Sequence, residues 1–219
     1  MNASKPQISL AEQAYIKLEE MIVTMRLAPG AALAEATLSE QLGIGRTPIR
    51  EALHRLARER LITILPQRGI IVSDINVGNQ LKVLEVRREL ERLIARSAAR
   101  RADEQQIIQF RELAAQLEDA ARSNDSEAFM NYDREFNKLS SMAARNEFLT
   151  GAIDLINSLS RRFWFAHFQR FADMPRSARL HANVALAIAN RDSSGAAAAS
   201  DALLDYIEQF TRATLAEGL

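Results

Sequence analysis

The stretch LSEQLGIGRTPIREALHRLARERLITILPQRGIIV, residues 38–72, contains the strongest structural signal in this chain. Its middle part is typical of a helix that buries one face, because apolar residues recur at positions i, i+3, i+4 and i+7: Ile49, Ala52, Leu53 and Leu56. Gly43 and Gly45 precede this helix, and glycine allows the tight turn and the close helix approach of a helix-turn-helix. Pro48 falls in the first helical turn, where its missing N–H costs nothing. The pattern predicts a second helix that begins near Arg46.

The side of this helix opposite the apolar stripe is basic. It carries Arg50, Glu51, His54, Arg55 and Arg58. In a helix-turn-helix, the N-terminal residues of the second helix meet base edges and phosphates in the major groove, and here these residues are Arg46, Thr47 and Arg50. Residues 46–68 contain six arginines against two glutamates, although the formal net charge of the whole chain is zero. A local basic surface on a neutral chain favours a protein that recognises a specific DNA site over one that covers DNA nonspecifically.

Two short β-branched runs follow the helix, at residues 61–65 and 70–72, with a Pro/Gly turn between them. This order is a hairpin signal, and it completes a winged helix-turn-helix. The hairpin tip carries Arg68 beside Gly69, a shape suited to contact with a phosphate or the minor groove. Seven residues are therefore expected to bind DNA: Arg46, Thr47, Pro48, Arg50, Arg55, Arg68 and Gly69. The alternative is a helix-turn-helix used for protein contact, or an ordinary basic helix.

The composition suits a protein of one or two domains, with 219 residues, 47% hydrophobic and 26% charged. There is no cysteine, which excludes disulfides and thiolate zinc sites. The sequence shows neither a basic-then-apolar signal peptide nor an uncharged apolar run of ~18 residues that could span a bilayer. We therefore expect a cytoplasmic protein.

Helices are predicted on both sides of the opening stretch. A helix over residues 9–25 and a break at Pro29–Gly30 precede the first helix of the helix-turn-helix, and the DNA-binding domain is expected to span residues 1–75. Residues 76–219 show little sign of strand and predict helices over 76–101, 103–121, 125–142, from 146 onward, 175–190 and 193–217, with Asp103, Asp125 and Asn146 as caps. Short connections favour an antiparallel arrangement. The predicted fold class is mainly α: an N-terminal winged helix-turn-helix followed by an antiparallel six-helix bundle.

The first part resembles the GntR family of bacterial winged-helix regulators. The resemblance lies in a helix, an APG break, the words LSEQLGIGRTPIREALHRL and then PQRG. It implies that Arg46, Thr47, Arg50 and Gly69 contact operator DNA. The chain departs from the family pattern at two places. It has Gly45 where serine is usual, which removes a helix-capping hydroxyl, and Ala36 where a DNA-contacting arginine is common.

The second part resembles the all-helical, FCD-type effector domain of the FadR-like branch of the same family. The matching words are EVRRELE at 85–91, DREFN at 133–137 and HANVALAIANRD at 181–192. The resemblance implies a homodimer that binds double-stranded, palindromic operator DNA and responds to a small-molecule effector. The helical part is expected to supply the dimer contact, because the basic helix must stay free for DNA.

In this branch, an Asp and three His residues bind a divalent metal to which a carboxylate effector coordinates. Here the resemblance places Asp133, Asn137, His181 and Tyr206 at those positions, so two imidazoles are missing. Asp133 and His181 form an incomplete site for zinc, nickel or manganese, and we expect metal to be weak or absent. We predict that a small organic acid binds directly to these four residues, with its carboxylate paired to Arg87. The alternatives are a buried Asp–His pair without a ligand and a solvated Arg87.

Three classes of function remain open for the whole chain. The first, and the one the residues favour, is a ligand-responsive dimeric transcription regulator that is not an enzyme. The second is a metal-dependent enzyme around Asp133, Asn137 and His181, which lacks an identifiable nucleophile. The third is a constitutive architectural protein whose helical domain only dimerises.

Overall fold

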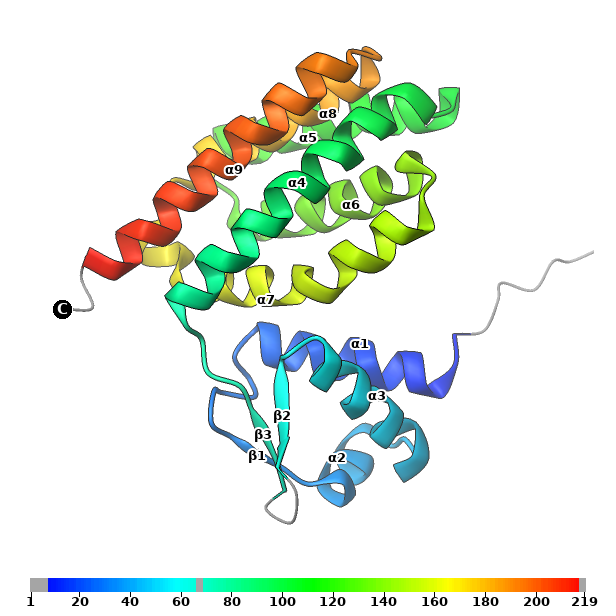
Figure 1. Ribbon diagram of the computed structural model, residues 1–219, viewed down its shortest axis with the longest axis vertical. Coiled ribbons are helices and arrows are strands. Elements are labelled where there is room, and N and C mark those ends of the chain that lie inside the picture. The colour runs from blue at the N-terminus through cyan, green and yellow to red at the C-terminus, as the bar shows by residue number, and fades with distance from the viewer. Residues whose placement is uncertain (1–7, 66–68, 217–219) are drawn as a thin grey trace, which may run out of the picture. The chain divides into compact units, whose positions relative to one another are not determined.

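The computed structural model describes residues 8–65 and 69–216, and its contacts divide the chain into two compact units. Unit 1 comprises Met1–Asn76 and Leu155–Ala166, and unit 2 comprises Val77–Asp154 and His167–Leu219. The elements in chain order are α1 (Leu10–Val23), β1 (Ala32–Leu33), α2 (Glu35–Leu42), α3 (Arg46–Arg58), β2 (Ile62–Leu65), β3 (Gly69–Val72), α4 (Val77–Arg101), α5 (Glu104–Ser123), α6 (Ser126–Ala144), α7 (Glu147–Phe171), α8 (Met174–Ala189) and α9 (Ser193–Ala216) (Figure 1). The expected fold class, mainly α with an N-terminal winged helix-turn-helix, is confirmed.

Unit 1 combines α1, α2 and α3 with a small antiparallel sheet in the order β1-β3-β2. In the hairpin, Ile62 lies opposite Val72 and Leu65 lies opposite Gly69, so the two predicted runs pair as the strands of the wing. The apolar stripe of α3 is fully buried in one core with side chains of α1 and the sheet: Leu18, Ile22, Ile49, Ala52, Leu53, Leu56, Leu61 and Val72. Strand β1 was not predicted, because two residues carry no periodicity and the strand exists only through its pairing with β3.

The turn between α2 and α3 is fixed by local contacts. Gly43 ends α2 in the left-handed region, at a φ of 65°, a conformation that glycine adopts without strain. Ile44 is buried, and its carbonyl accepts a hydrogen bond from Ser39 Oγ at 2.6 Å. Gly45 precedes α3 and supplies no side-chain cap. The first turn of α3 therefore begins with uncapped backbone N–H groups at an exposed position.

Unit 1 also contains the central part of α7. Leu159 packs against the core of the unit, and Arg161 Nη1 lies 2.7 Å from Glu19 Oε1. Arg162 is buried and donates hydrogen bonds to the carbonyl oxygens of Ser73 and Asp74, both at 2.9 Å. The expected boundary after residue 75 lies beside the structural one after residue 76, but the periodicity of the sequence did not indicate that residues 155–166 group with the first unit.

Unit 2 is built on helices whose ends follow the predicted caps. Asp103 forms a capping box with Gln106, Asp125 accepts from the N–H groups of residues 127 and 128, and Asn146 accepts from those of residues 148 and 149. At the start of α9, the carboxylate of Asp192 accepts a hydrogen bond from Gly195 N at 2.8 Å and so caps the helix. A Cβ at residue 195 would collide with this carboxylate, which favours glycine.

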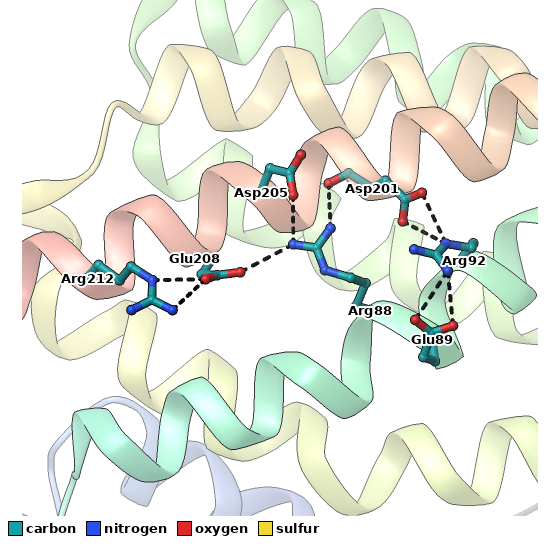
Figure 2. A network of polar contacts seen from close by, with 7 residues as sticks. All are labelled: Arg88, Glu89, Arg92, Asp201, Asp205, Glu208 and Arg212. Carbon is teal, nitrogen blue, oxygen red and sulfur yellow. Dashed lines mark hydrogen bonds and ion pairs between the residues drawn. The ribbon is translucent and has the colours of Figure 1, made fainter.

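A network of charged side chains joins α4 to α9 in unit 2 (Figure 2). Arg88 Nη2 lies 2.7 Å from Asp205 Oδ1, and Arg92 Nε lies 2.8 Å from Asp201 Oδ1. Glu208 contacts Arg88 and also Arg212 on its own helix. Since these charges are part-exposed, each pair contributes little alone, and the network acts mainly to fix how α4 and α9 lie against each other.

The interior of unit 2 comes from pairs of neighbouring helices, chiefly α5 with α8, α4 with α9 and α8 with α9. Its largest fully buried side chains include Phe110, Leu117, Ile188 and Leu204. Across the residues that the structure describes, no helix is both long and apolar enough to cross a membrane.

Candidate nucleic-acid interface and buried polar cluster

The start of α3 presents polar side chains on the surface of unit 1. Arg46, Thr47 and Arg50 are all exposed, whereas Pro48 is half-buried in the first turn. Gly69 is exposed at the start of β3, where its φ of 99° suits glycine alone. Arg68 lies outside the described residues. The structure thus brings together, on α3, three of the residues expected to contact DNA.

Arg50 has a partner within unit 1. Its Nε and Nη2 donate to the carboxylate of Glu35, on α2, at 2.9 and 2.7 Å. The Glu35 carboxylate, through its hydrogen bond and its charge, raises the pKa of Arg50 above its ordinary value. Glu35 was not among the residues singled out from the sequence, because a carboxylate outside the basic helix gives no periodic signal.

Arg55 is held by contacts within unit 1. Its Cζ stands 3.5 Å from the centroid of the Tyr15 ring, and its nitrogens lie 2.8 Å from Glu12 and 3.1 Å from Glu59. The Tyr15 hydroxyl donates to the other oxygen of Glu59 at 2.9 Å. Burial, and then the charge of Glu59, raise the pKa of Tyr15, so the phenol keeps its proton. These contacts fasten α1 to α3 and favour a structural role for Arg55 over a DNA contact.

In unit 2, three of the predicted effector residues form a polar cluster, in which His181 is buried and Asp133 and Asn137 are part-buried. His181 Nε2, on α8, lies 3.0 Å from Asp133 Oδ1, on α6, and Asn137 Nδ2 donates to the same oxygen at 3.0 Å. The other ring nitrogen of His181, Nδ1, lies 2.8 Å from the carbonyl oxygen of Ser177. Phe129 and Phe136 meet the imidazole edge-to-face. Both nitrogens of His181 are therefore used by the protein.

The charge state of His181 follows from its surroundings. Burial disfavours the imidazolium and by itself lowers the pKa of His181. The hydrogen bond and charge of Asp133, the Ser177 carbonyl and the charge of Glu91 act in the opposite direction, and the net pKa is raised. An imidazolium beside the Asp133 carboxylate makes the pair neutral overall, which reduces the repulsion that a carboxylate ligand would meet there.

The other two predicted effector residues are engaged elsewhere in unit 2. Arg87 is largely buried, and its Nε donates to Glu91 Oε1 at 2.6 Å. The Tyr206 hydroxyl donates to the carbonyl oxygen of Asp173 and accepts from its N–H, both at 2.9 Å. Glu91, the partner of Arg87, is one of the charges that raise the pKa of His181. Tyr206 instead ties α9 to the start of α8.

The residues present do not fit a tight metal centre. The cluster offers one imidazole and one carboxylate, and these two groups bond to each other. Tyr206 spends its hydroxyl on the backbone of Asp173. Among the described residues, no group of three or more His, Asp or Glu side chains is placed to hold a metal ion. This donor set falls short of the three protein ligands that a tight zinc site uses.

A separate hollow of about 520 Å³ lies along the first turns of α6. It is open to solvent and lined by polar residues that include Asp125, Tyr132 and Glu135. Neither Asp133 nor His181 lines it, so this hollow is distinct from the buried polar cluster.

Two family profiles match successive parts of this chain. The profile of the FCD domain matches residues 82–206, and that of the bacterial regulatory proteins of the gntR family matches residues 10–72. The galactonate operon transcriptional repressor of Escherichia coli is 30% identical, over 94% of this chain and 96% of its own length. The chain belongs to the GntR family. Its members among the relatives are transcriptional regulators and not enzymes, so this protein is a GntR-family transcription regulator with an FCD effector domain.

Two other relatives support the same family. The transcriptional repressor RspR of Escherichia coli is 27% identical over 97% of this chain and 92% of its own length. The solved structure of Escherichia coli McbR/YncC superposes with a TM-score of 0.79 at 21% identity, covering 95% of this chain and all of that one, which shows a common fold. The family predicted from the sequence is confirmed, as is the prediction of a regulator instead of an enzyme.

The two departures from the family pattern occupy exposed positions of this GntR regulator. Ala36 lies in the first turn of α2 and is exposed. Gly45 has room for a side chain, since the nearest atom to an added Cβ is 3.9 Å away, on Pro48. Neither departure disturbs the packing of unit 1, because both residues are exposed.

Proposed function

We propose that this protein is a repressor that binds an inverted-repeat operator as a homodimer and changes its DNA affinity when a small organic acid binds unit 2. The observation that carries the proposal is the exposed N-terminal part of α3, where Arg46, Thr47 and Arg50 lie on the surface above a fully packed core. Arginine donates two parallel hydrogen bonds to guanine, and the start of this helix is the part that enters the major groove. Two relatives are named as repressors. Because chromosomal DNA is the proposed target, we place the protein in the cytoplasm.

Arg46→Ala is the direct test of DNA reading. An operator is first selected from random duplexes with the full chain, and affinities are then measured by titration at several salt concentrations. Arg46→Ala is expected to weaken operator binding by about 1–3 kcal/mol and to relax the base preference at one position of each half-site. Arg58→Ala, at the far end of α3, is the matched control and should leave the base preference unchanged, with at most a uniform loss of affinity and a smaller salt dependence. Unchanged affinity and base preference in Arg46→Ala would place the recognition surface elsewhere.

The effector is proposed to bind at the buried polar cluster, with its carboxylate near Arg87 and its polar groups near Asn137 and His181. The imidazolium of His181 and the guanidinium of Arg87 supply positive charge, while Asp133 orients the imidazole. Because Arg87 is paired with Glu91, the ligand carboxylate must either bind Arg87 alongside Glu91 or displace Glu91 from it. One relative is named for a galactonate operon, and galactonate is a sugar acid. In this arrangement Asp133 orients the imidazole of His181, and Tyr206 forms part of the wall of the site. Neither residue acts as a metal ligand.

Calorimetry with a panel of sugar acids and small dicarboxylates tests this effector proposal. Binding is expected to survive a chelator, and Arg87→Met should weaken it by about tenfold or more, since a buried charge-assisted pair is lost. The control is Arg96→Met, an exposed arginine on the same helix, which should leave binding unchanged. Stoichiometric zinc, nickel or manganese that disappears in Asp133→Ala or His181→Ala would contradict the metal-free site.

The dimer contact is proposed to lie on α4. Val86 and Leu93 are 53% and 40% exposed, and a spacing of seven residues puts them on one face of the helix. A two-fold axis between them would set Val86 of one copy against Leu93 of the other, as an isologous interface requires. Leu93→Glu is expected to shift the full chain to monomers in light scattering. Ile108→Glu, at an exposed apolar residue of α5, should leave the dimer intact. A monomeric wild-type protein at micromolar concentration would exclude the proposal.

A further inference from the structure

A bidentate ion pair joins the two helices of the helix-turn-helix on the exposed side of unit 1. The Glu35 carboxylate accepts from Nε and Nη2 of Arg50 at 2.9 and 2.7 Å, and the Arg50 side chain is still 60% exposed. The hydrogen bond from Arg50, and the charges of Arg50, His54 and Arg46, hold the pKa of the Glu35 carboxyl below its usual value. Glu35 is therefore an anion in the middle of the basic surface at neutral pH.

The pair leaves one edge of the guanidinium available. An arginine has five N–H donors in a planar fork, and Glu35 takes the one on Nε and one of the two on Nη2. No hydrogen bond from Arg50 Nη1 occurs among the residues that the structure describes. The donors on Nη1 and on the outer side of Nη2 have the spacing that matches O6 and N7 of guanine. Glu35 thus occupies the inner edge of the fork and leaves the outer edge for DNA.

The pair also changes how strongly Arg50 is attracted to phosphates. An unpaired arginine on a helix surface samples many rotamers and is drawn to any phosphate, which gives affinity without sequence information. Held by Glu35, the side chain is ordered before DNA arrives, and the neighbouring negative charge offsets its attraction to the backbone. Both effects favour the correct base over nonspecific DNA.

We propose that Glu35 is a positioning residue that sets the base specificity of Arg50 by fixing its guanidinium edge-on toward the major groove. The inference rests on the proposed function, because it requires that Arg50 reads a base. It assigns to α2 a direct part in specificity, whereas the usual contribution of this helix is to support α3 and contact the backbone.

Two other roles for Glu35 make different predictions. If Glu35 only masked Arg50, its removal would strengthen operator binding and leave base discrimination unchanged. If Glu35 only braced α2 against α3, its removal would weaken binding to every duplex by the same factor and lower the unfolding temperature of unit 1. Only a positioning role predicts that removal of Glu35 lowers base discrimination without an equal loss of affinity for every duplex.

The test measures dissociation constants of the full chain for three duplexes. These are the selected operator, the operator with the base pair read by Arg50 replaced, and a random duplex. The variants are Glu35→Ala, Glu35→Gln, Arg50→Lys and the control Glu40→Ala, which removes the same charge from an exposed position of α2. Thermal unfolding of each variant is followed alongside, and Glu35→Gln keeps the side-chain size should Glu35→Ala fold poorly.

The discrimination ratio is the dissociation constant for the operator with the replaced base pair divided by that for the intact operator. Glu35→Ala is expected to reduce this ratio by about fivefold to tenfold, and to leave unchanged or raise the affinity for the random duplex. Glu35→Gln should give an intermediate ratio, and Glu40→Ala should keep the wild-type ratio. A wild-type ratio in Glu35→Ala, with or without a gain in affinity, would overturn the inference, as would parallel losses on all three duplexes. If Arg50→Lys also kept the wild-type ratio, the reading role of Arg50 in the proposed function would fail, which is a separate outcome.

Discussion

His181→Ala is expected to lower the free energy of unfolding of unit 2 by about 3–5 kcal/mol, because it deletes a buried aromatic ring together with its contact to the Asp133 carboxylate. Asp133 would lose its contact with His181 Nε2 at 3.0 Å, while the hydrogen bond from Asn137 would remain. The space of the imidazole between Phe129 and Phe136 would also become a cavity, which adds to the cost. Urea unfolding of the full chain, followed by the helical circular dichroism signal, measures the change.

Two further variants separate the pair from its surroundings. Asn137→Ala removes one hydrogen bond to Asp133 and should cost about 1 kcal/mol. Combining His181→Ala with Asp133→Asn should recover part of the loss, with a coupling of about 1–3 kcal/mol in the double-mutant cycle. If the two single effects were additive, the pair would not act as a unit, and its role in orienting an effector would lose its basis.

The positions of the helices could be predicted because their signals are local. Asp103, Asp125 and Asn146 each bond to N–H groups two or three residues ahead, so the sequence itself contains both partners. The apolar stripe of α3 is likewise a property of one helix. Helix ends and buried faces therefore followed from spacing alone, to within one or two residues for most elements.

Contacts between distant segments could not be predicted in the same way. A helical wheel placed Arg55 on the polar side of α3 but could not show that Tyr15 lies beside it, 40 residues earlier in the chain. The Glu35–Arg50 pair has the same origin, since it depends on the angle that the turn sets between two helices. For Tyr206, family position indicated a ligand contact, whereas the hydroxyl bonds to the backbone of Asp173. In each case tertiary packing determines the partner of a long polar side chain, and the local sequence pattern does not indicate that partner.

Arg162→Met is expected to destabilise unit 1 by about 2–4 kcal/mol, since charge-assisted hydrogen bonds to two carbonyl oxygens are lost. The side chain is only 3% exposed, and its nitrogens lie 2.9 Å from the carbonyl oxygens of Ser73 and Asp74, just after β3. Burial lowers the pKa of Arg162, and the charge of Asp74 opposes this shift, yet an arginine remains charged at neutral pH. Methionine fills much of the same volume but cannot donate, so the loss reports on the hydrogen bonds and not on a cavity.

The single tryptophan, Trp164, belongs to unit 1, so its fluorescence during urea unfolding follows this unit. Arg26→Met is the matched control. Its guanidinium is exposed and pairs with Glu20 at 3.8 Å, a surface contact whose loss should cost less than about 0.5 kcal/mol. Operator affinity should fall in Arg162→Met at temperatures where unit 1 begins to unfold and stay near wild type below them, because Arg162 is buried and cannot itself contact DNA. A midpoint in Arg162→Met equal to that of Arg26→Met would show that the hydrogen bonds from Arg162 to the segment after β3 contribute no measurable stability to unit 1.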